Sequence, residues 1–151
     1  MPMDTLNYLK IDVCAKLHDT FATSKKYIDL QDKILKISDI TKYKIITQKE
    51  PSNTREFLNA FMRENNIEFK PDIEIVSYAL VVEFIKSGFG VGYVTKEFVK
   101  DELEKGEIYE IKIDKTIPER SLGIVTLKNA IPNFATRKFI NLLKENVDND
   151  M

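Results

Sequence analysis

The chain has 151 residues, a formal net charge of −1, 43% hydrophobic residues and 31% charged residues. This length suits one domain, or one lobe with part of another, and the composition supports a packed core. The near-neutral charge excludes a protein drawn to nucleic acid by a strong overall field. No apolar run approaches the roughly 20 residues of a membrane helix, so we expect no membrane partner.

The cysteine content and the first ten residues indicate in which cellular compartment the protein is expected. The single cysteine, Cys14, excludes an internal disulfide and any motif built from paired cysteines. It fits a reducing environment. Residues Met1–Lys10 carry no apolar run of the signal-peptide kind, so we expect a cytoplasmic protein. The sequence also lacks a recognisable set of acid, base and nucleophile and a cluster of metal ligands, so it predicts no catalytic residue, no metal site and no cofactor.

The first third of the chain predicts mainly extended structure. Residues Leu9–Ser24 alternate apolar and polar side chains along their first half, as a strand does. Lys25–Lys36 is polar and predicts a loop, and Ser38–Ile40 predicts a short helical turn. A further strand is expected at Tyr43–Gln48.

A polar turn then opens a helix that runs to about Asn65. Asn53 is expected to cap this helix, with Glu56 reaching back to form a capping box. The N–H groups at a helix start attract carboxylate or phosphate. Ser52, Asn53 and Thr54 are therefore the first candidate ligand-binding residues, with added charge from Arg55. Plain helix capping explains the same residues and remains the alternative.

The stretch Asp72–Lys96 predicts a strand, a helix, a glycine turn and a second strand. Asp72–Val76 is β-branched, Tyr78–Ser87 carries an apolar stripe, and Val91–Val94 is again β-branched. Because one short helix joins the two strands, we expect them to be parallel neighbours in one sheet.

The start of that helix is the second candidate ligand-binding site. Ser77 and Tyr78 follow the carboxyl end of a strand, where open α/β sheets bind ligands. Helix capping by Ser77 is again the alternative.

Three glycines, Gly88, Gly90 and Gly92, follow the helix. A phosphate-binding loop would need the order strand, glycine, helix, whereas here the glycines lead from a helix into a strand. We expect Gly88 to end the helix in the left-handed conformation, and the glycines to allow a tight turn and close backbone packing.

The last third predicts two more helices and two more strands. A helix capped by Thr95 is expected over Thr95–Lys105 with Phe98 facing inward, and strands are expected at Glu107–Ile113 and Arg120–Leu127. A last helix, Phe134–Leu143, follows Pro132. Strands that alternate with helices give an α/β layered fold.

The only histidine, His18, stands next to Asp19. A neighbouring acid suggests acid–base chemistry, but adjacent residues of a strand point to opposite faces and cannot form a dyad with each other. A structural histidine, or one at the edge of a cleft, is favoured.

The ordered motifs resemble the effector-binding domain of LysR-type transcriptional regulators. The resemblance rests on the strand, Ser77 and apolar helix followed by Gly88–Thr95. It extends to three further segments: Pro51–Arg55, Glu102–Tyr109 and Ile117–Arg120, and it covers roughly Ile11 to Val147.

This resemblance implies a Rossmann-like lobe of a type 2 periplasmic-binding-protein-like fold, with three α/β/α layers and a mixed sheet. Residues 1–19 would lead from a missing first lobe, residues 20–113 would form the second lobe, and residues 114–151 would return to the first. The chain would then be truncated. The strand Arg120–Leu127 would need a new partner, either in the N-terminal segment or in a second molecule.

The resemblance also implies a function. An effector-sensing domain would bind a small anionic molecule between its lobes through Ser52–Thr54, Ser77 and Tyr78, with Thr20 near the lobe crossing. It would form a homodimer or higher homo-oligomer, with the helix Thr54–Asn65 against a partner subunit, and would reach DNA only through an N-terminal domain. A solute-binding protein for transport stays an alternative, disfavoured by the missing signal peptide, and a small α/β enzyme is a third.

Overall fold

The computed structural model describes residues 8–150. These residues fall into two compact units. Unit 1 combines the residues up to Leu17 with those from Glu119 onward, and unit 2 comprises His18–Pro118.

Unit 1 is built from two long strands and one helix. Strand β1 (Leu9–Leu17) pairs antiparallel with β8 (Arg120–Leu127), in a register that opposes the first residue of β1 to the last of β8. The strand Arg120–Leu127 therefore takes its partner from the N-terminal segment, which was the first of the two expected alternatives. Helix α5 (Phe134–Asp150) follows β8, and Lys144 on it forms an ion pair of 3.6 Å with Asp12 of β1.

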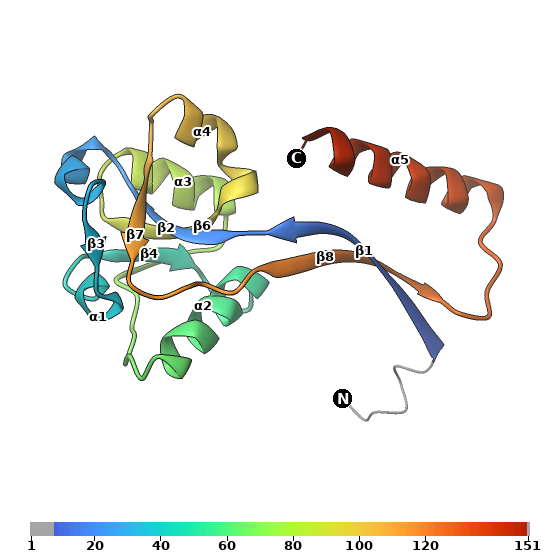
Figure 1. The fold of residues 1–151 in the computed structure, drawn as a ribbon, viewed down its shortest axis with the longest axis horizontal. Coiled ribbons are helices and arrows are strands. Elements are labelled where there is room, and N and C mark those ends of the chain that lie inside the picture. Colours follow the sequence, from blue (N-terminus) through green and yellow to red (C-terminus); the bar gives the residue numbers. More distant parts are fainter. Residues whose placement is uncertain (1–7, 151) are drawn as a thin grey trace. The chain divides into compact units, whose positions relative to one another are not determined.

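Unit 2 is an alternating series of strands and helices (Figure 1). Its strands are β2 (Asp19–Thr23), β3 (Ile34–Leu35), β4 (Ile45–Gln48), β5 (Ile73–Ile75), β6 (Val91–Thr95) and β7 (Tyr109–Ile113). Its helices are η2 (Lys25–Leu30), α1 (Ile37–Ile40), α2 (Asn53–Glu64), α3 (Tyr78–Lys86), η3 (Lys96–Phe98) and α4 (Lys100–Glu104).

The six strands of unit 2 form one mixed sheet in the order β3-β7-β2-β6-β4-β5. Strand β2 is antiparallel to both of its neighbours, whereas β4 is parallel to β5 and β6, and β3 is parallel to β7. The expectation that the two strands flanking α3 are neighbours is wrong. Strand β4 lies between them, because Ile46 is paired with Ile73 on one side and with Gly92 on the other.

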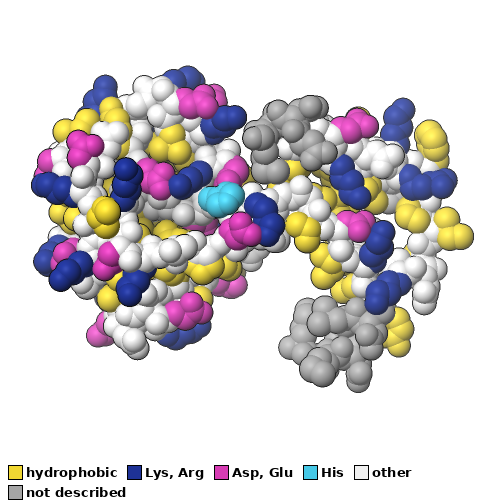
Figure 2. Space-filling model, viewed as in Figure 1, with side chains coloured by type: hydrophobic (Ala, Val, Ile, Leu, Met, Phe, Trp, Pro, Cys, Tyr) yellow, Lys and Arg dark blue, Asp and Glu magenta, His cyan; other side chains and the backbone are white. Residues whose placement is uncertain are grey.

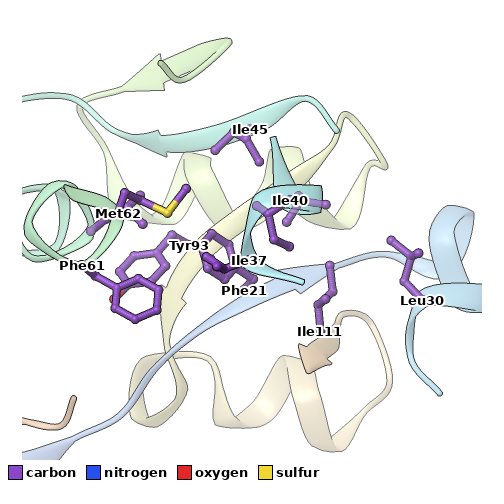
Figure 3. Packing of buried hydrophobic residues seen from close by; sticks show 11 residues of the cluster. Phe21, Leu30, Ile37, Ile40, Ile45, Phe61, Met62, Tyr93 and Ile111 are labelled. Carbon is purple, nitrogen blue, oxygen red and sulfur yellow. The ribbon is translucent and has the colours of Figure 1, made fainter. Parts of the chain in front are cut away.

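Helices cover both faces of this sheet, which confirms the three-layer prediction. Successive residues of a strand point to opposite faces and so enter two separate cores. Helices α1 and α2 cover one core (Figure 3), and α3 and α4 cover the other. The alternation is clear in three strands: Phe21 and Ala22, Ile45 and Ile46, and Tyr93 and Val94.

Two predicted elements differ from the structure. The polar segment Lys25–Lys36 is not a plain loop, since it forms η2 and the short strand β3. The helix predicted over Thr95–Lys105 is broken into η3 and α4, because Val99 has non-helical angles (φ −126°, ψ 23°). The break turns Phe98 outward, with 57% of its surface exposed, where we expected it to face the core.

Gly88 ends α3 as predicted. Its φ of 75° lies in the left-handed region, and its N–H donates to the carbonyl of Ile85 at 2.9 Å.

Candidate functional site

One edge of the sheet in unit 2 collects the starts of two helices. The parallel strands β4, β5 and β6 end there, and the antiparallel strand β2 begins there. We call this edge the rim. It consists of Asp19, Thr20, Ser52–Thr54, Ser77, Tyr78 and Thr95. Gln48 pairs with Ile75, so α2 and α3 start just beyond two neighbouring strands, whereas Thr20 lies on β2, on the far side of β6.

The start of α2 is capped by Ser52, whose Oγ accepts the N–H of Arg55 at 3.1 Å. The cap is therefore one residue earlier than predicted, and the capping box of Asn53 and Glu56 does not form. Within the described residues, the backbone N–H groups of Asn53 and Thr54 have no hydrogen-bond acceptor. These two groups are at the positive end of the helix dipole and can receive an anion.

The start of α3 has a similar geometry. Ser77 is exposed, and its Oγ accepts the N–H of Leu80 at 3.4 Å. The hydroxyl of Tyr78 accepts the backbone N–H of Thr95 at 2.9 Å. Tyr78 thus ties the start of α3 to the end of β6, a contact that fixes the shape of the rim.

Arg55 does not supply charge to a ligand, contrary to the sequence-based expectation. It is only 7% exposed, because its side chain lies against the sheet beneath α2. Its guanidinium donates to Thr47 Oγ1 at 3.0 Å, to Glu74 Oε2 at 2.9 Å and, through Nε, to Asn59 Oδ1 at 2.8 Å. These bonds join α2 to β4 and β5 and hold the helix start in place.

Buried polar groups lie at the start of β2. Thr20 is 3% exposed, and its hydroxyl donates to the carbonyl of Phe21 at 3.3 Å. The neighbouring Asp19 is also buried and accepts hydrogen bonds from Thr95 Oγ1 at 2.7 Å and from the Tyr93 hydroxyl at 3.3 Å. The side chain of Thr95, predicted to cap a helix, is thus directed to Asp19.

A hollow of about 240 Å³ opens beside the start of β2. Its lining includes Thr20 and a mixed set of charges (Figure 2, histidine in cyan). Lys96 pairs there with Glu110 at 2.7 Å. The other lining residues are His18, Asp19, Ile111, Lys112, Ile113, Lys115 and Ile117.

His18 borders this hollow and is held by Glu97. The ring Nδ1 lies 2.6 Å from Glu97 Oε1, and the backbone N–H donates to Oε2 at 2.9 Å. Sequence reasoning missed this pair because the two residues are far apart in the chain. Burial raises the pKa of the Glu97 carboxyl, but the hydrogen bonds from His18 and from the Glu97 backbone, together with the charge of His18, outweigh burial, so that the pKa lies below the ordinary value of 4.5.

This lowered pKa predicts how stability depends on pH. The contact stabilises the folded state above the ordinary carboxyl pKa and is lost as the pH falls through the lower pKa of the folded state. The gap in the free energy of unfolding between wild type and Glu97→Gln should therefore narrow as the pH falls below about 4. Urea unfolding at several pH values measures it. Glu104→Gln, a change of an exposed acid, serves as the control. A gap for Glu97→Gln that stays constant with pH would contradict the assignment.

The rim can bind a small anion. The unused N–H groups of α2 and the exposed Ser77 hydroxyl favour an anion over a cation. Among the side chains that the structure describes, no group of three or more His, Cys, Asp or Glu could hold a metal ion. Over the same residues, no helix is long and apolar enough to cross a membrane.

Comparison with known sequences gives one family. The profile of the LysR substrate binding domain matches residues 20–148. A protein of Guillardia theta named "Probable RuBisCO transcriptional regulator" is 26% identical over 96 residues, which are 62% of this chain and 31% of that protein. A protein of Cyanophora paradoxa with the same name is 26% identical over 104 residues, 67% of this chain and 32% of that protein. The chain thus spans about a third of the length of these relatives.

Comparison with solved structures gives the same fold. The regulatory domain of CcmR from Synechocystis PCC6803, in complex with 2-PG, superposes with a TM-score of 0.81 at 15% identity over 94% of this chain and 68% of that one. The effector binding domain of QuiR in complex with shikimate gives a TM-score of 0.75 at 15% identity, over 95% and 67% of the two chains. The regulatory domain of CrgA from Neisseria meningitidis gives 0.67 at 14% identity, over 92% and 69%.

Proposed function

The chain belongs to the LysR substrate-binding domain family, and from this premise we propose that it is the effector-sensing part of a transcription regulator. The rim of unit 2 binds a small anionic molecule through the helix start at Ser52–Thr54 and the hydroxyl of Ser77. Tyr78 and Thr20 complete the ligand-facing set, Tyr78 by shaping the rim and Thr20 from the adjoining hollow.

One observation carries this proposal. Two helices start just beyond neighbouring parallel strands, so their dipoles and N–H groups converge on one edge of the sheet. The N–H groups of Asn53 and Thr54 donate to no acceptor within the described chain, and Arg55 fixes the helix that carries them. A carboxylate or phosphate at this edge would gain about 0.3–1 kcal/mol from each exposed helix start, and more where it is partly buried.

In this proposal, the ligand affects transcription because its binding is coupled to the arrangement of the protein. A ligand changes a regulator only if it binds one arrangement of the protein more tightly than another. In this proposal the subunits assemble as homo-oligomers and DNA is contacted by another part of the regulator, consistent with the near-neutral charge of the chain. The chain acts by binding, without catalysis, which agrees with its membership of an effector-binding family.

Thr54→Asp separates ligand binding from stability. An acid in the first turn of α2 should leave the free energy of unfolding unchanged or raise it by about 0.3–1 kcal/mol, because it complements the helix dipole. The same charge should weaken anion binding at least about tenfold, which is 1.4 kcal/mol of binding free energy. Each protein is titrated with a panel of small organic acids and phosphate esters that includes 2-PG and shikimate. Thermal shift detects the binders, and calorimetry measures their affinities.

The matched control is Ala135→Asp. It places the same acid in the first turn of α5, which is exposed and belongs to unit 1. The control should bind the panel as the wild type does. Equal affinity for Thr54→Asp and Ala135→Asp, or a panel with no binder, would contradict the proposal.

A further inference from the structure

The opposite edge of the same sheet carries a concentration of lysines. Strands β4 and β6 begin there and β2 ends there, next to η2 and the carboxyl end of α3 (Figure 1). Two hollows of about 490 and 550 Å³ open at this edge and share Lys26, Ser87 and Gly88. Four lysines line the first hollow and three line the second, whereas Glu107 is the only acid in either lining. The lysines of the two hollows are Lys25, Lys26, Lys42, Lys44, Lys86 and Lys105.

Three of these lysines have charges that the described residues do not balance. Lys86 pairs with Glu107 at 2.8 Å, Lys42 with Asp39 at 2.7 Å, and Lys105 with Asp101 at 3.6 Å. Within residues 8–150, Lys25, Lys26 and Lys44 form no ion pair with a carboxylate. Unbalanced ammonium groups around a hollow favour an anionic occupant, in a chain whose net charge is −1.

The walls of the second hollow are aromatic. Tyr27, Tyr43 and Phe89 line it, and the rings of Tyr27 and Tyr43 meet edge to face at 6.0 Å between centroids. Phe89 leaves 51% of its surface exposed although it contacts Phe84. The ammonium of Lys26 lies 5.7 Å from the centre of the Tyr27 ring, at the junction of the two hollows. The first hollow thus presents charge, and the second presents ring faces and edges.

We propose that these two hollows form a second ligand site, separate from the rim, for a small molecule that joins a di- or triphosphate group to a planar ring. The phosphates contact Lys25, Lys26 and Lys105 in the first hollow, and the ring packs against Phe89 and Tyr43 in the second. A nucleoside diphosphate has this chemistry, because its phosphates attract lysine and its base stacks on aromatic side chains.

In this proposal, side chains bind the phosphates, and the backbone N–H groups of the glycine turn do not. The N–H of Gly88 donates to Ile85 O at 2.9 Å, and that of Phe89 donates to Phe84 O at 3.1 Å, so neither amide is available to phosphate. The carboxyl end of α3 carries a partial negative charge of about half an electron, which opposes an anion. In the first hollow, the two unbalanced charges of Lys25 and Lys26 exceed that partial charge several-fold, so the net field there remains attractive.

The test measures binding of ADP, pyrophosphate and adenosine to the full chain by calorimetry at low and physiological salt. ADP should bind at least about tenfold more tightly than pyrophosphate or adenosine, because only ADP fills both hollows. Its affinity should fall as the salt concentration rises, since the lysines are exposed. Equal affinities for ADP and pyrophosphate would overturn the two-part site.

Two variants test the phosphate-binding and ring-binding parts of the site separately. Lys25→Ser with Lys105→Ser should reduce the affinity for both ADP and pyrophosphate at least about tenfold. Phe89→Ser should reduce only the affinity for ADP. The control, Lys70→Ser with Lys100→Ser, removes two exposed lysines that line neither hollow and should leave both affinities unchanged.

Three further outcomes would overturn the proposal. The first is that the wild type does not bind ADP, and the second is that the lysine variant and its control lose the same affinity for ADP. The third is that Thr54→Asp loses ADP binding, which would place the nucleotide at the rim. Circular dichroism of each variant excludes unfolding as the cause. The rim proposal is tested by the binding of the acid panel to Thr54→Asp and Ala135→Asp, and the second site by the binding of ADP to the lysine and Phe89 variants, so either proposal can fail without the other.

Discussion

Gly90→Ala should lower the free energy of unfolding by about 3 kcal/mol, within the range seen when a packed interior receives an extra group. A Cβ at this position would stand 2.2 Å from the carbonyl oxygen of Lys44 and 3.0 Å from its carbonyl carbon. That oxygen accepts the N–H of Val91 at 2.8 Å, so relieving the clash means separating the neighbouring strands β4 and β6 where they begin. Urea unfolding followed by circular dichroism measures the loss.

Gly106→Ala is the control for backbone strain. Gly106 has a φ of 66°, but an added Cβ would meet only the hydroxyl end of Tyr109 at 3.3 Å and the adjoining ring carbon at 3.8 Å. Its cost should be about 1–2 kcal/mol, from the left-handed backbone alone. Gly90 has no such backbone requirement, so its larger cost is steric. A Gly90→Ala protein as stable as wild type would show that β4 and β6 are not packed as described.

Arg55→Met should lower the free energy of unfolding by about 2–3 kcal/mol, because it leaves buried polar partners without a donor. Thr47 is 1% exposed, and its hydroxyl and the carbonyl of Gln48 both accept from Arg55. Glu74 is partly exposed and can be hydrated after the change, which keeps the cost below that of a fully buried ion pair. Methionine has a similar length, so little packing is lost.

Arg55→Lys provides the matched comparison. Lysine keeps the charge but lacks the planar fork that reaches Thr47, Glu74 and Asn59 together, so it should recover only part of the stability. Both variants are measured by urea unfolding at low and high salt. An Arg55→Met protein with unchanged stability and weakened anion binding would reverse the assignment, and Arg55 would then be a ligand contact.

The local pattern of the sequence predicted most elements of unit 2. Alternation located the strands, and the apolar stripe with Ser77 and Gly88 defined α3 almost to the residue. Such patterns contain no information on which strands pair, so the insertion of β4 between β5 and β6 was missed. The break at Val99 was missed for a related reason, since an apolar stripe does not show a local change of backbone angles.

The site was predicted in part. Serine, asparagine and threonine at helix starts are local signals, and the structure places Ser52–Thr54 and Ser77 at one edge of the sheet. Contacts between distant residues leave no such signal. Arg55 was expected to add charge at the ligand site, whereas its guanidinium donates to Glu74 of β5. His18 was expected to be a structural or cleft-edge histidine, and its contact with Glu97 of η3 was not foreseen.

The central claim is that backbone N–H groups at the start of α2 bind the effector. Asn53→Pro tests it most directly, because proline is well tolerated at the first position of a helix, and Ser52 already has the extended backbone that precedes proline (φ −144°, ψ 144°). The variant removes one N–H and adds no charge. We predict unchanged thermal stability and a calorimetric affinity for the panel ligand that falls about five- to tenfold. A variant that is equally stable and binds as tightly as wild type would contradict the account.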